Sequence, residues 1–321
     1  MDVLQVVDQV VVDALSNYKE FVKDQCIKCD RCKKNCDFLE KYDINLFDFT
    51  NGEDLRFSCF LCDKCKQVCP KDLSGKDLAL EFRKENNGNY LTAFLKNHYP
   101  LKNNCAKKSS SLLFLGCNYP ANYPKTSEKL IEICAQKGID FSIDCCKKPA
   151  IEQGYSPNFK GLKDLFEKKE VDELITACPN CYDTLKNIGI NVIDVYSFLK
   201  RENIGKKIDK KIDIFFPCPD RYKREIFKSI KYFIDDYNDK FKEVDCCGLG
   251  GSAIKNEKEL VDKKQEDIKR LNTNGIYTYC ASCSGMFKSY GQKNIKNILS
   301  EILDVNEEVS DNRLKNRIKY K

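Results

Sequence analysis

The sequence contains no tryptophan, one histidine and no long apolar run, and each scarcity argues against a kind of protein. A single histidine, His98, speaks against a histidine-rich zinc site, a bis-histidine haem, a Rieske pair and a Ser-His-Asp triad. No stretch reaches the roughly 18 apolar residues that cross a bilayer. The most apolar N-terminal segment, residues 3–15 (VLQVVDQVVVDAL), carries Asp8 and Asp13. It therefore predicts an amphipathic helix and not a signal peptide or membrane anchor.

The charge is nearly balanced, because 55 basic and 49 acidic residues are interleaved along 321 positions and leave a net charge of +6. Runs such as KKEVDE and DKKQED are typical of solvated helix faces, so we expect no nucleic-acid partner. The length predicts two or three domains.

Cysteine is abundant, with twenty residues in the chain. A secreted disulfide scaffold would be shorter and would need an export signal. We therefore expect reduced thiols that ligate metal in a cytoplasmic protein, with no membrane span and with any membrane association through a partner. His98 stands in a polar stretch (KNHYPLK) and is expected to be an ordinary surface residue.

Two cysteine runs in the first third share the spacing C-x2-C-x2-C-x3-C. Three thiolates at steps of three can hold one cubane, and the fourth ligand then comes from the other run, as in two-cluster ferredoxins. A pair of zinc ribbons, the alternative, fits this spacing poorly. The segments DFLEKYDINLFDF and GKDLALEFRKEN have helical spacing, so the module should be mostly helical. The spacing assigns one [4Fe-4S] cubane to Cys26, Cys29, Cys32 and Cys69, and a second to Cys59, Cys62, Cys65 and Cys36.

The remaining two-thirds contains an internal repeat of cysteines. In each copy a single cysteine is followed 28 positions later by a Cys-Cys pair, and a C-x2-C motif begins 32 or 33 positions after that pair. Because the order and the spacing both recur, chance does not easily account for them. The first copy consists of Cys117, Cys145, Cys146, Cys178 and Cys181, and the second of Cys218, Cys246, Cys247, Cys280 and Cys283.

The apolar runs SLLFLG and IDIFFP have strand length and end at Cys117 and Cys218. In the same places of the two copies, DFSID and KEVD lead into the Cys-Cys pairs, and ELITA and IYTY lead into the C-x2-C motifs, so we expect strands there too. Helical stretches such as TSEKLIEICAQKG and DRYKREIFKSIKYFIDDY lie between them. Alternating strands and helices predict an α/β unit with a largely parallel sheet. In such sheets, ligands gather at the carboxyl ends of the strands, where all three cysteine groups fall. Five thiolates that are distant in sequence are therefore expected to converge.

The motif DCCGLGGSA admits a nucleotide cradle, a vicinal disulfide or part of a metal site. The G-x-G-x-x-G pattern is not met, and a disulfide would leave the other three cysteines of the set without a role. The metal interpretation uses all five cysteines. Under it, Gly248, Gly250 and Gly251 let the backbone pass close to a bulky cofactor.

These motifs resemble the CCG-domain family, and the whole chain is similar to a fusion of the C and B subunits of heterodisulfide reductase, as in its D subunit. The likeness rests on CIKCDRCKKNC, CFLCDKCKQVCP, DCCKKPA, TACPNCYDTLK, DCCGLGG and CASC. It implies that the ten repeat cysteines are catalytic ligands that hold one or two non-cubane [4Fe-4S] clusters. The alternative for each set is a conventional cubane or a zinc site that uses four of the five cysteines. The family splits the disulfide between coenzyme M and coenzyme B, which implies a role in methanogenesis.

The chain departs from the family at Lys147 and Lys148, where glycine is frequent, and in its short first spacers and overall length. These departures bear on the substrate more than on the clusters, because no ligand is missing. Lys147, Lys148 and Arg221 lie near the expected cluster loops, either to pair with an acidic substrate group or as solvated side chains. Cys134 lies on a helical apolar stripe and should pack there, and Cys105 should lie in a linker.

The sequence thus predicts an α+β multidomain protein: a mostly helical ferredoxin-like module over 1–105, a first CCG repeat over 106–207 and a second over 208–321. We expect an iron-sulfur oxidoreductase of the disulfide reductase type, working as a subunit of a complex. Its partners would be a flavoprotein or other redox subunit and a small disulfide or thiol substrate. The alternative is a non-catalytic electron-transfer subunit of a flavin-dependent 2-hydroxy acid or glycerol-3-phosphate dehydrogenase.

Overall fold

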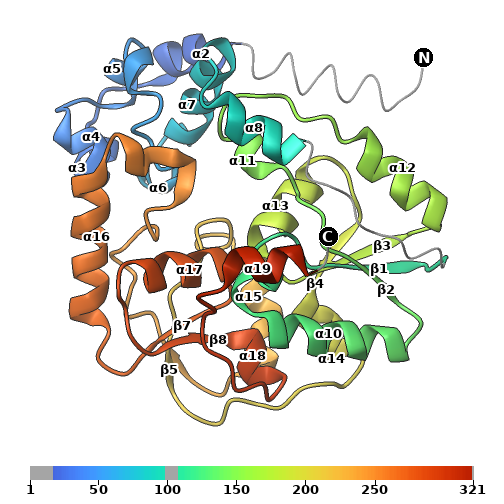
Figure 1. Ribbon diagram of the computed structural model, residues 1–321. Helices are drawn as coiled ribbons and strands as arrows, with labels where there is room; N and C mark the ends of the chain where they lie inside the picture. Colours follow the sequence, from blue (N-terminus) through green and yellow to red (C-terminus); the bar gives the residue numbers. More distant parts are fainter. Residues whose placement is uncertain (1–16, 98–107, 320–321) are drawn as a thin grey trace. The chain divides into compact units, whose positions relative to one another are not determined.

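The computed structural model describes residues 17–97 and 108–319, which form two compact units. Unit 1 contains the N-terminal segment as far as Leu95 together with Pro149–Pro157 and Gly248–Lys263, and unit 2 contains the rest. Each of the two later pieces of unit 1 begins within three residues of a Cys-Cys pair. Figure 1 labels most of the helices and strands named below. The predicted N-terminal helix, His98 and Cys105 lie outside the described residues.

The N-terminal segment of unit 1 is helical where it is described, as expected. The rings of Phe38, Phe49 and Phe82 pack edge to face, with centroids 5.3 and 5.8 Å apart, and form its core. Its assignment as a ferredoxin module stays a prediction. The helices here are α2 (Tyr18–Gln25), α3 (Arg31–Lys34), α4 (Asp37–Lys41), α5 (Leu46–Phe49), the 3-10 helix η1 (Glu53–Leu55), α6 (Lys64–Val68), α7 (Gly75–Glu85) and α8 (Tyr90–Asn97). The later segments add most of α11 (Lys148–Ile151), the 3-10 helix η3 (Gly250–Lys255) and the first part of α16 (Lys258–Leu271), whose residues from Lys264 onward belong to unit 2.

The stretch between the two cysteine runs is divided into α4 and α5 by a turn. Asp43 adopts a left-handed conformation, with φ of 54°, which ends the first helix. Asn45 then begins the second, because its side chain accepts hydrogen bonds from the Phe47 and Asp48 amides and Asp48 bonds back to the Asn45 amide.

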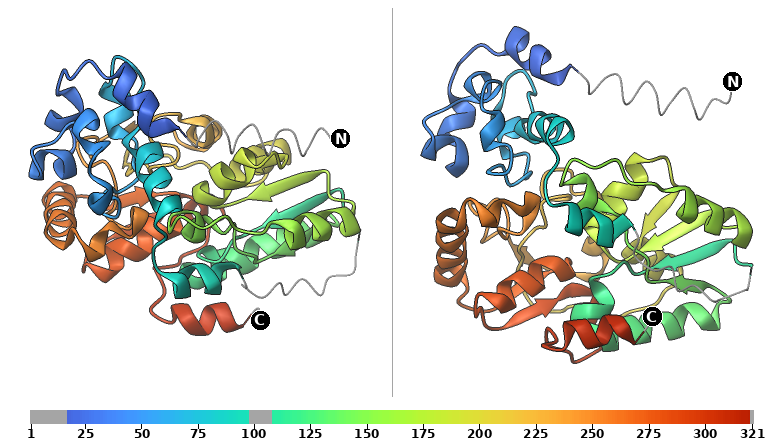
Figure 2. Two further views of the ribbon diagram at one scale, coloured as in Figure 1. Left: turned by 90° about the horizontal axis from the view of Figure 1, so that it is seen from above. Right: turned by 45° about the horizontal axis from the view of Figure 1, so that its top comes forward.

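The first repeat in unit 2 is a four-stranded sheet in the order β2-β1-β3-β4, and all its strand pairs are parallel, as predicted. Figure 2 shows the strands running side by side. Leu112, Leu113 and Phe114 on the second strand of this order are fully buried. The strands are β1 (Ser111–Phe114), β2 (Asp140–Ser142), β3 (Glu173–Thr176) and β4 (Val192–Asp194). The helices are α9 (Tyr119–Asn122), α10 (Pro124–Gln136), α12 (Lys160–Lys169), α13 (Pro179–Asn187) and α14 (Val195–Arg201).

The second repeat reproduces this order with shorter strands. Strands β5 and β6 pair in parallel, β7 and β8 do likewise, and a parallel bridge from Ile214 to Tyr277 joins the two pairs. The resulting order, β6-β5-β7-β8, matches that of the first repeat. Its strands are β5 (Ile212–Asp213), β6 (Tyr237–Asn238), β7 (Ile276–Thr278) and β8 (Ile295–Asn297). Its helices are α15 (Glu225–Ile230), the 3-10 helix η2 (Lys231–Phe233), α17 (Ala281–Ser289), α18 (Ile298–Ile302) and, at the C-terminal end, α19 (Arg313–Ile318).

The strand predicted over 242–245 was wrong. The Lys242 amide donates to the Asp239 carbonyl and the Val244 amide to the Phe241 carbonyl, so this segment turns. The partner of β5 is β6, which ends before the turn.

The single helix predicted over 220–237 was also wrong, because only α15 and η2 form there. The carboxylate of Asp220 accepts hydrogen bonds from the Ile226 and Phe227 amides at 3.1 and 3.0 Å. Arg224 precedes the helix in a left-handed conformation, with φ of 54°. These contacts begin the helix five residues later than its apolar spacing indicates.

The structure therefore combines helices and parallel strands in two repeats, as predicted. The division into three consecutive domains stays a prediction, since unit 1 draws on all three of the predicted segments. In the described part of the chain, no helix has both the length and the apolar character needed to cross a bilayer.

Candidate metal centres

All nineteen cysteines in the described part of the chain are thiols, and none forms a disulfide. The metal interpretation requires reduced sulfur, because the thiolate is the form that ligates iron.

The first cysteine group in unit 1 lines one pocket. Cys26, Cys29, Cys32 and Cys69 surround a space of about 310 Å³, measured to its open mouth. Burial raises the pKa of Cys32, and the charges of Cys26 and Cys69 raise it further. The Leu46 amide donates to Cys32 Sγ at 3.4 Å. Three cysteines of the first run and the last of the second thus lie together.

The second group surrounds Cys65. Burial raises the pKa of this thiol well above its ordinary value, and Cys36, Cys59 and Cys62 are close enough to raise it further. Burial raises the pKa of Cys59 to about 12. The Gly75 amide donates to Cys65 Sγ at 3.2 Å and the Leu61 amide to Cys59 Sγ at 3.4 Å. N–H···S bonds of this kind tune iron-sulfur clusters.

The two cysteine runs share one backbone conformation. Lys28 and Leu61, which precede the second cysteine of each run, have φ of 53° and 55°. Asp30 and Asp63, which follow it, have φ of 58° and 62°. Left-handed residues among right-handed ones turn successive N–H groups toward one side, and such concavities bind phosphates and iron-sulfur clusters. Strained conformations repeated at matching positions point to a functional loop.

In the first repeat, the cysteines follow the ends of three adjacent parallel strands. Phe114 of β1 pairs with Ser142 of β2 and with Thr176 of β3, so the three strands end level with one another. Cys117, Cys145 and Cys178 come two or three residues later. The sheet therefore gathers the set at one edge, as the sequence predicts.

The thiols of this first five-cysteine set contact one another. Cys181 donates toward Cys146 and Cys178, which raises its own pKa. Hydrogen bonds from Cys145 and Cys181 lower the pKa of Cys146 against the effect of burial. Gly116, next to Cys117, lies so close that a Cβ there would be 2.7 Å from Cys181 Sγ.

The second five-cysteine set repeats the arrangement. Cys283 donates toward Cys247 and Cys280. Burial raises the pKa of Cys218 to about 12, and its electrostatic neighbours include Cys247 and Cys280. The remaining member, Cys246, is fully buried beside Cys247.

The residue after each Cys-Cys pair is left-handed, with φ of 61° at Lys147 and 84° at Gly248. This explains why glycine suits the position and why lysine there is strained. Gly250 and Gly251 approach backbone: a Cβ would be 2.4 Å from the Phe60 carbonyl oxygen and 2.6 Å from that of Cys59. These contacts require glycine by themselves, and a role of the three glycines beside a cofactor stays a prediction.

The chemistry of the sulfur groups fits iron-sulfur clusters. Within residues 17–97 and 108–319, no three His, Cys, Asp or Glu side chains could hold a metal ion as they stand. A cluster makes a different demand, because its thiolates bind several irons and not one ion. Amide N–H groups directed at Cys32, Cys59, Cys65 and Cys145 would stabilise the negative charge on such thiolates.

Arg221 gives a second indication that a negatively charged group belongs at the second set. It is only 4% exposed, contrary to the solvated alternative. Its Nε and Nη2 have no hydrogen-bond partner in the described part of the chain. Its charge lowers the pKa of Cys218, although burial of that thiol dominates.

Asn180 was not singled out from the sequence, although it contacts Lys148 and the second set. Lys148 Nζ donates to Asn180 Oδ1 at 2.6 Å, and Asn180 Nδ2 donates to Cys280 Sγ at 3.7 Å. Asn180 lies between Cys178 and Cys181, so its place inside the C-x2-C motif was the available signal. Cys134 is fully buried on α10, as predicted, and belongs to neither set.

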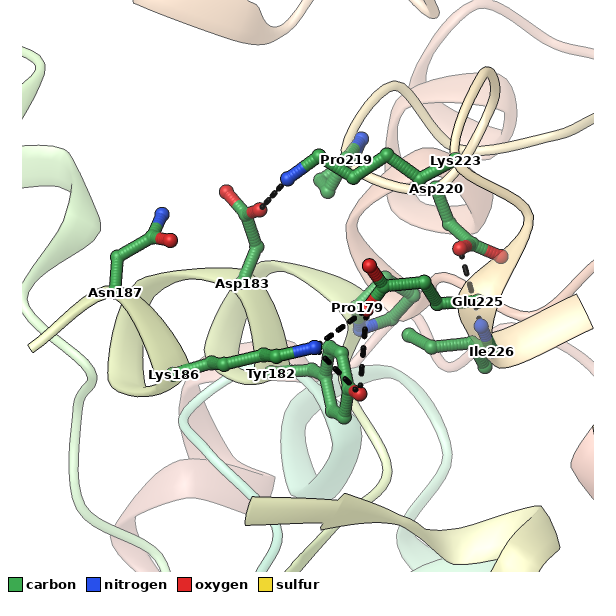
Figure 3. A pocket seen from close by; sticks show the side chains of 10 residues that line it. All are labelled: Pro179, Tyr182, Asp183, Lys186, Asn187, Pro219, Asp220, Lys223, Glu225 and Ile226. Carbon is green, nitrogen blue, oxygen red and sulfur yellow. Dashed lines mark hydrogen bonds and ion pairs between the residues drawn. The ribbon is translucent and has the colours of Figure 1, made fainter. Parts of the chain in front are cut away.

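A pocket of about 360 Å³, measured to its open mouth, lies between α13 and residues 219–226 (Figure 3). Lys186 pairs with Glu225 at 2.8 Å and Lys223 with Asp183 at 3.2 Å. Both pairs join the first repeat to the second. Since its cations are already paired, the pocket serves the contact between the repeats better than it serves an anion.

The comparisons with known proteins agree with this geometry. The model of the CCG cysteine-rich domain matches residues 111–186 and again 224–288. The first range contains all five cysteines of the first set, and the second contains those of its set except Cys218.

Curated relatives come from methanogens. The B subunit of fumarate reductase (CoM/CoB) from Methanothermobacter marburgensis is 26% identical over 227 residues, 60% of this chain and 45% of the relative. An uncharacterized iron-sulfur protein of Methanococcus maripaludis is 24% identical over 200 residues, 55% and 40% of the two chains. Another, from Methanocaldococcus jannaschii, is 26% identical over 268 residues, 68% and 54%. The chain spans about half the length of these relatives.

The chain thus carries two CCG cysteine-rich domains, one in each repeat. It is similar to iron-sulfur proteins of methanogens, among them a fumarate reductase (CoM/CoB) subunit, which agrees with the resemblance of its motifs, and these relatives support an iron-sulfur redox role.

Proposed function

We propose that this protein passes electrons from a redox partner through two [4Fe-4S] cubanes to five-cysteine clusters that reduce a disulfide. The observation that carries the proposal is the gathering of five cysteines beyond three adjacent parallel strands, in an order repeated twice. The relative named for CoM and CoB supports the disulfide of these two thiols as the substrate class.

The assignment of ligands follows the groups described above. One cubane would be held by Cys26, Cys29, Cys32 and Cys69, and the other by Cys36, Cys59, Cys62 and Cys65. The two five-cysteine sets would each hold a non-cubane [4Fe-4S] cluster. When bound, these clusters supply one-electron carriers at four places in the chain.

The residues of the chain have three tasks in this reaction. The thiolates bind the clusters, and amides such as those of Gly75 and Lys147 stabilise the charge on sulfur. Eight of the ten repeat cysteines are buried, which limits the access of water to the reducing end, and Cys117 and Cys218 are half-buried. Reduction of one disulfide takes up two electrons and two protons and releases two thiols, so two one-electron carriers can complete it. The electrons come from the redox partner and the protons from solvent.

The decisive experiment supplies reduced viologen and the coenzyme M–coenzyme B disulfide to the anaerobic protein and measures thiol release. Cys181→Ala should abolish release, because it removes a sulfur from the first set. Cys134→Ala is the matched control, because that buried thiol lies outside both sets, and it should retain release. If the wild-type protein takes up electrons but releases no thiol, the electron-transfer subunit of a flavin enzyme becomes the better proposal.

Iron and sulfide analysis tests the clusters separately. Two cubanes and two five-cysteine clusters require about sixteen irons per chain. About eight irons with zinc would contradict the assignment of the repeat cysteines.

A further inference from the structure

A buried cation with unpaired donors lies near the second five-cysteine set. Arg221 lies three residues after Cys218 and is buried, with Nε and Nη2 unpaired in the described part of the chain. Its Nη1 donates to the Phe241 carbonyl at 3.4 Å, and its guanidinium lies 4.9 Å from the Phe215 ring centroid. A buried cation with unpaired donors is costly unless an anion completes it.

The first repeat supplies two further groups to this second set. Asn180 belongs to the C-x2-C motif of the first set, but its amide donates to Cys280 Sγ of the second at 3.7 Å. Lys148 Nζ holds the amide oxygen of Asn180 at 2.6 Å. One hydrogen-bonded chain therefore runs from the first motif to the second set.

For each of these three residues, the residue at the aligned position of the other repeat is neutral. The counterpart of Arg221 is Pro120, that of Lys148 is Leu249 and that of Asn180 is Ser282. A buried aspartate, Asp144 or Asp245, precedes each Cys-Cys pair.

Beside the first set, Lys147 Nζ donates to the Asn158 carbonyl, and Arg317 donates to the Cys117 carbonyl and to Asn118 Oδ1, so both cations are bound by neutral oxygens. Near the second set, the carboxylate of Asp220 accepts from the Ile226 and Phe227 amides and from the Tyr279 hydroxyl. The second set therefore differs in having a buried guanidinium with unpaired donors and a side-chain amide directed at a cysteine sulfur.

We propose that Arg221, Lys148 and Asn180 raise the reduction potential of the cluster at the second set above that of the first. The inference rests on the proposed function, because it requires a cluster at each set. A cluster becomes more negative when it is reduced, so nearby cations and N–H···S donors stabilise the reduced form. An electron would then reside on the cluster of the second set before it passes to the disulfide substrate.

The test is a redox titration of the full-length anaerobic protein, followed by the EPR signals of its clusters. The wild-type protein should give two midpoint potentials for the five-cysteine clusters. Asn180→Ala and Arg221→Met should each lower the higher one by about 59 mV, a tenfold change in a one-electron equilibrium constant, and leave the lower one in place. Arg221→Lys keeps the charge and should restore most of the shift. Lys186→Met, which removes an exposed cation from the same helix as Asn180, should change neither potential.

The outcomes separate this inference from the proposed function. If both variants keep the iron content of the wild type and leave the higher potential unchanged, or shift the lower one instead, the inference is wrong while the clusters stand. If the wild-type protein lacks two five-cysteine clusters, the proposed function fails and the inference with it. If Arg221→Met loses iron, its potential cannot be compared with that of the wild type. The midpoint potential of Asn180→Ala then decides the question, because this substitution removes one amide and no charge.

Discussion

Gly116 is the residue at which backbone and sulfur come closest in the first repeat. Its φ of 67° lies in the left-handed region, and its missing Cβ leaves room for Cys181 Sγ. Gly138 has nearly the same φ, 71°, but open space around it. The two glycines therefore separate the cost of backbone strain from the cost of displacing a sulfur atom.

We predict that Gly116→Ala lowers the iron content of the purified protein by about four irons, one cluster. The new Cβ, 2.7 Å from Cys181 Sγ, must push that thiolate away. Gly138→Ala should cost a similar 1–2 kcal/mol, roughly, from its left-handed backbone but keep its iron. Iron analysis and chemical unfolding of the three proteins check this. Equal iron in all three would contradict the prediction.

Helix α19 holds the loop that carries Cys117 of the first set. Arg317 donates from Nη2 to Asn118 Oδ1 at 2.8 Å and from Nε to the Cys117 carbonyl at 3.3 Å. Arg313 donates to the Gly285 carbonyl on α17 at 2.9 Å. A six-residue helix with no buried side chain is thus held by its polar groups.

We predict that Arg317→Met destabilises the protein by about 1–2 kcal/mol, the usual value of two such hydrogen bonds. It should also speed the release of iron to a chelator, because the Cys117 loop loses its support. Lys315→Met, an exposed substitution on the same helix, is the control and should leave both unchanged. Anaerobic thermal unfolding and chelator kinetics measure the two effects. Faster release in the control as well would show a general effect of the helix.

Strand-level patterns predicted much of the repeat architecture. The runs at 111–114, 140–142 and 173–176 form parallel strands that end before the cysteines, because buried apolar residues at strand length are a local signal. The strand at 237–238 and the late start of α15 were missed. Their causes are a turn at 239–244 and the capping of Ile226 and Phe227 by Asp220, contacts that apolar spacing does not contain.

At the scale of the whole molecule, the order of the predicted domains does not indicate that unit 1 combines three separate segments of the chain. Glu257, from the second repeat, is fully buried in unit 1 and accepts from Lys41 Nζ at 2.7 Å and from Tyr42 Oη at 2.8 Å. Arg83 is also fully buried and donates to the carbonyls of Arg56, Cys59 and Glu152. These polar contacts between distant segments have no periodic signature.

We predict that Glu257→Gln lowers stability at pH 7 by about 1–3 kcal/mol, the value of hydrogen bonds to a charged group. Burial raises the pKa of Glu257, but hydrogen bonds from Lys41, Ser58 and Tyr42 outweigh it and hold the pKa below its ordinary value. A depressed folded pKa stabilises the protein above the unfolded value of about 4.3, and the contribution is lost as the pH falls through the folded pKa.

The difference between the wild type and Glu257→Gln should therefore be full at pH 6–8, roughly, and should vanish under more acidic conditions. Unfolding by urea over this range measures it. Glu259→Gln is the control, since Glu259 pairs with the same Lys41 but is 68% exposed. If the difference stayed constant down to low pH, the ionised carboxylate would not be its source.

Because unit 1 is made of three separate segments of the chain, its composition also affects when it can fold during synthesis in the cell. A nascent chain cannot complete this unit when the N-terminal cysteines leave the ribosome, because Gly248–Lys263 has still to be translated. Insertion of the two proposed cubanes into a finished fold would therefore follow synthesis of most of the polypeptide. Until then, those eight thiols would have to be protected from oxidation and from binding other metal ions.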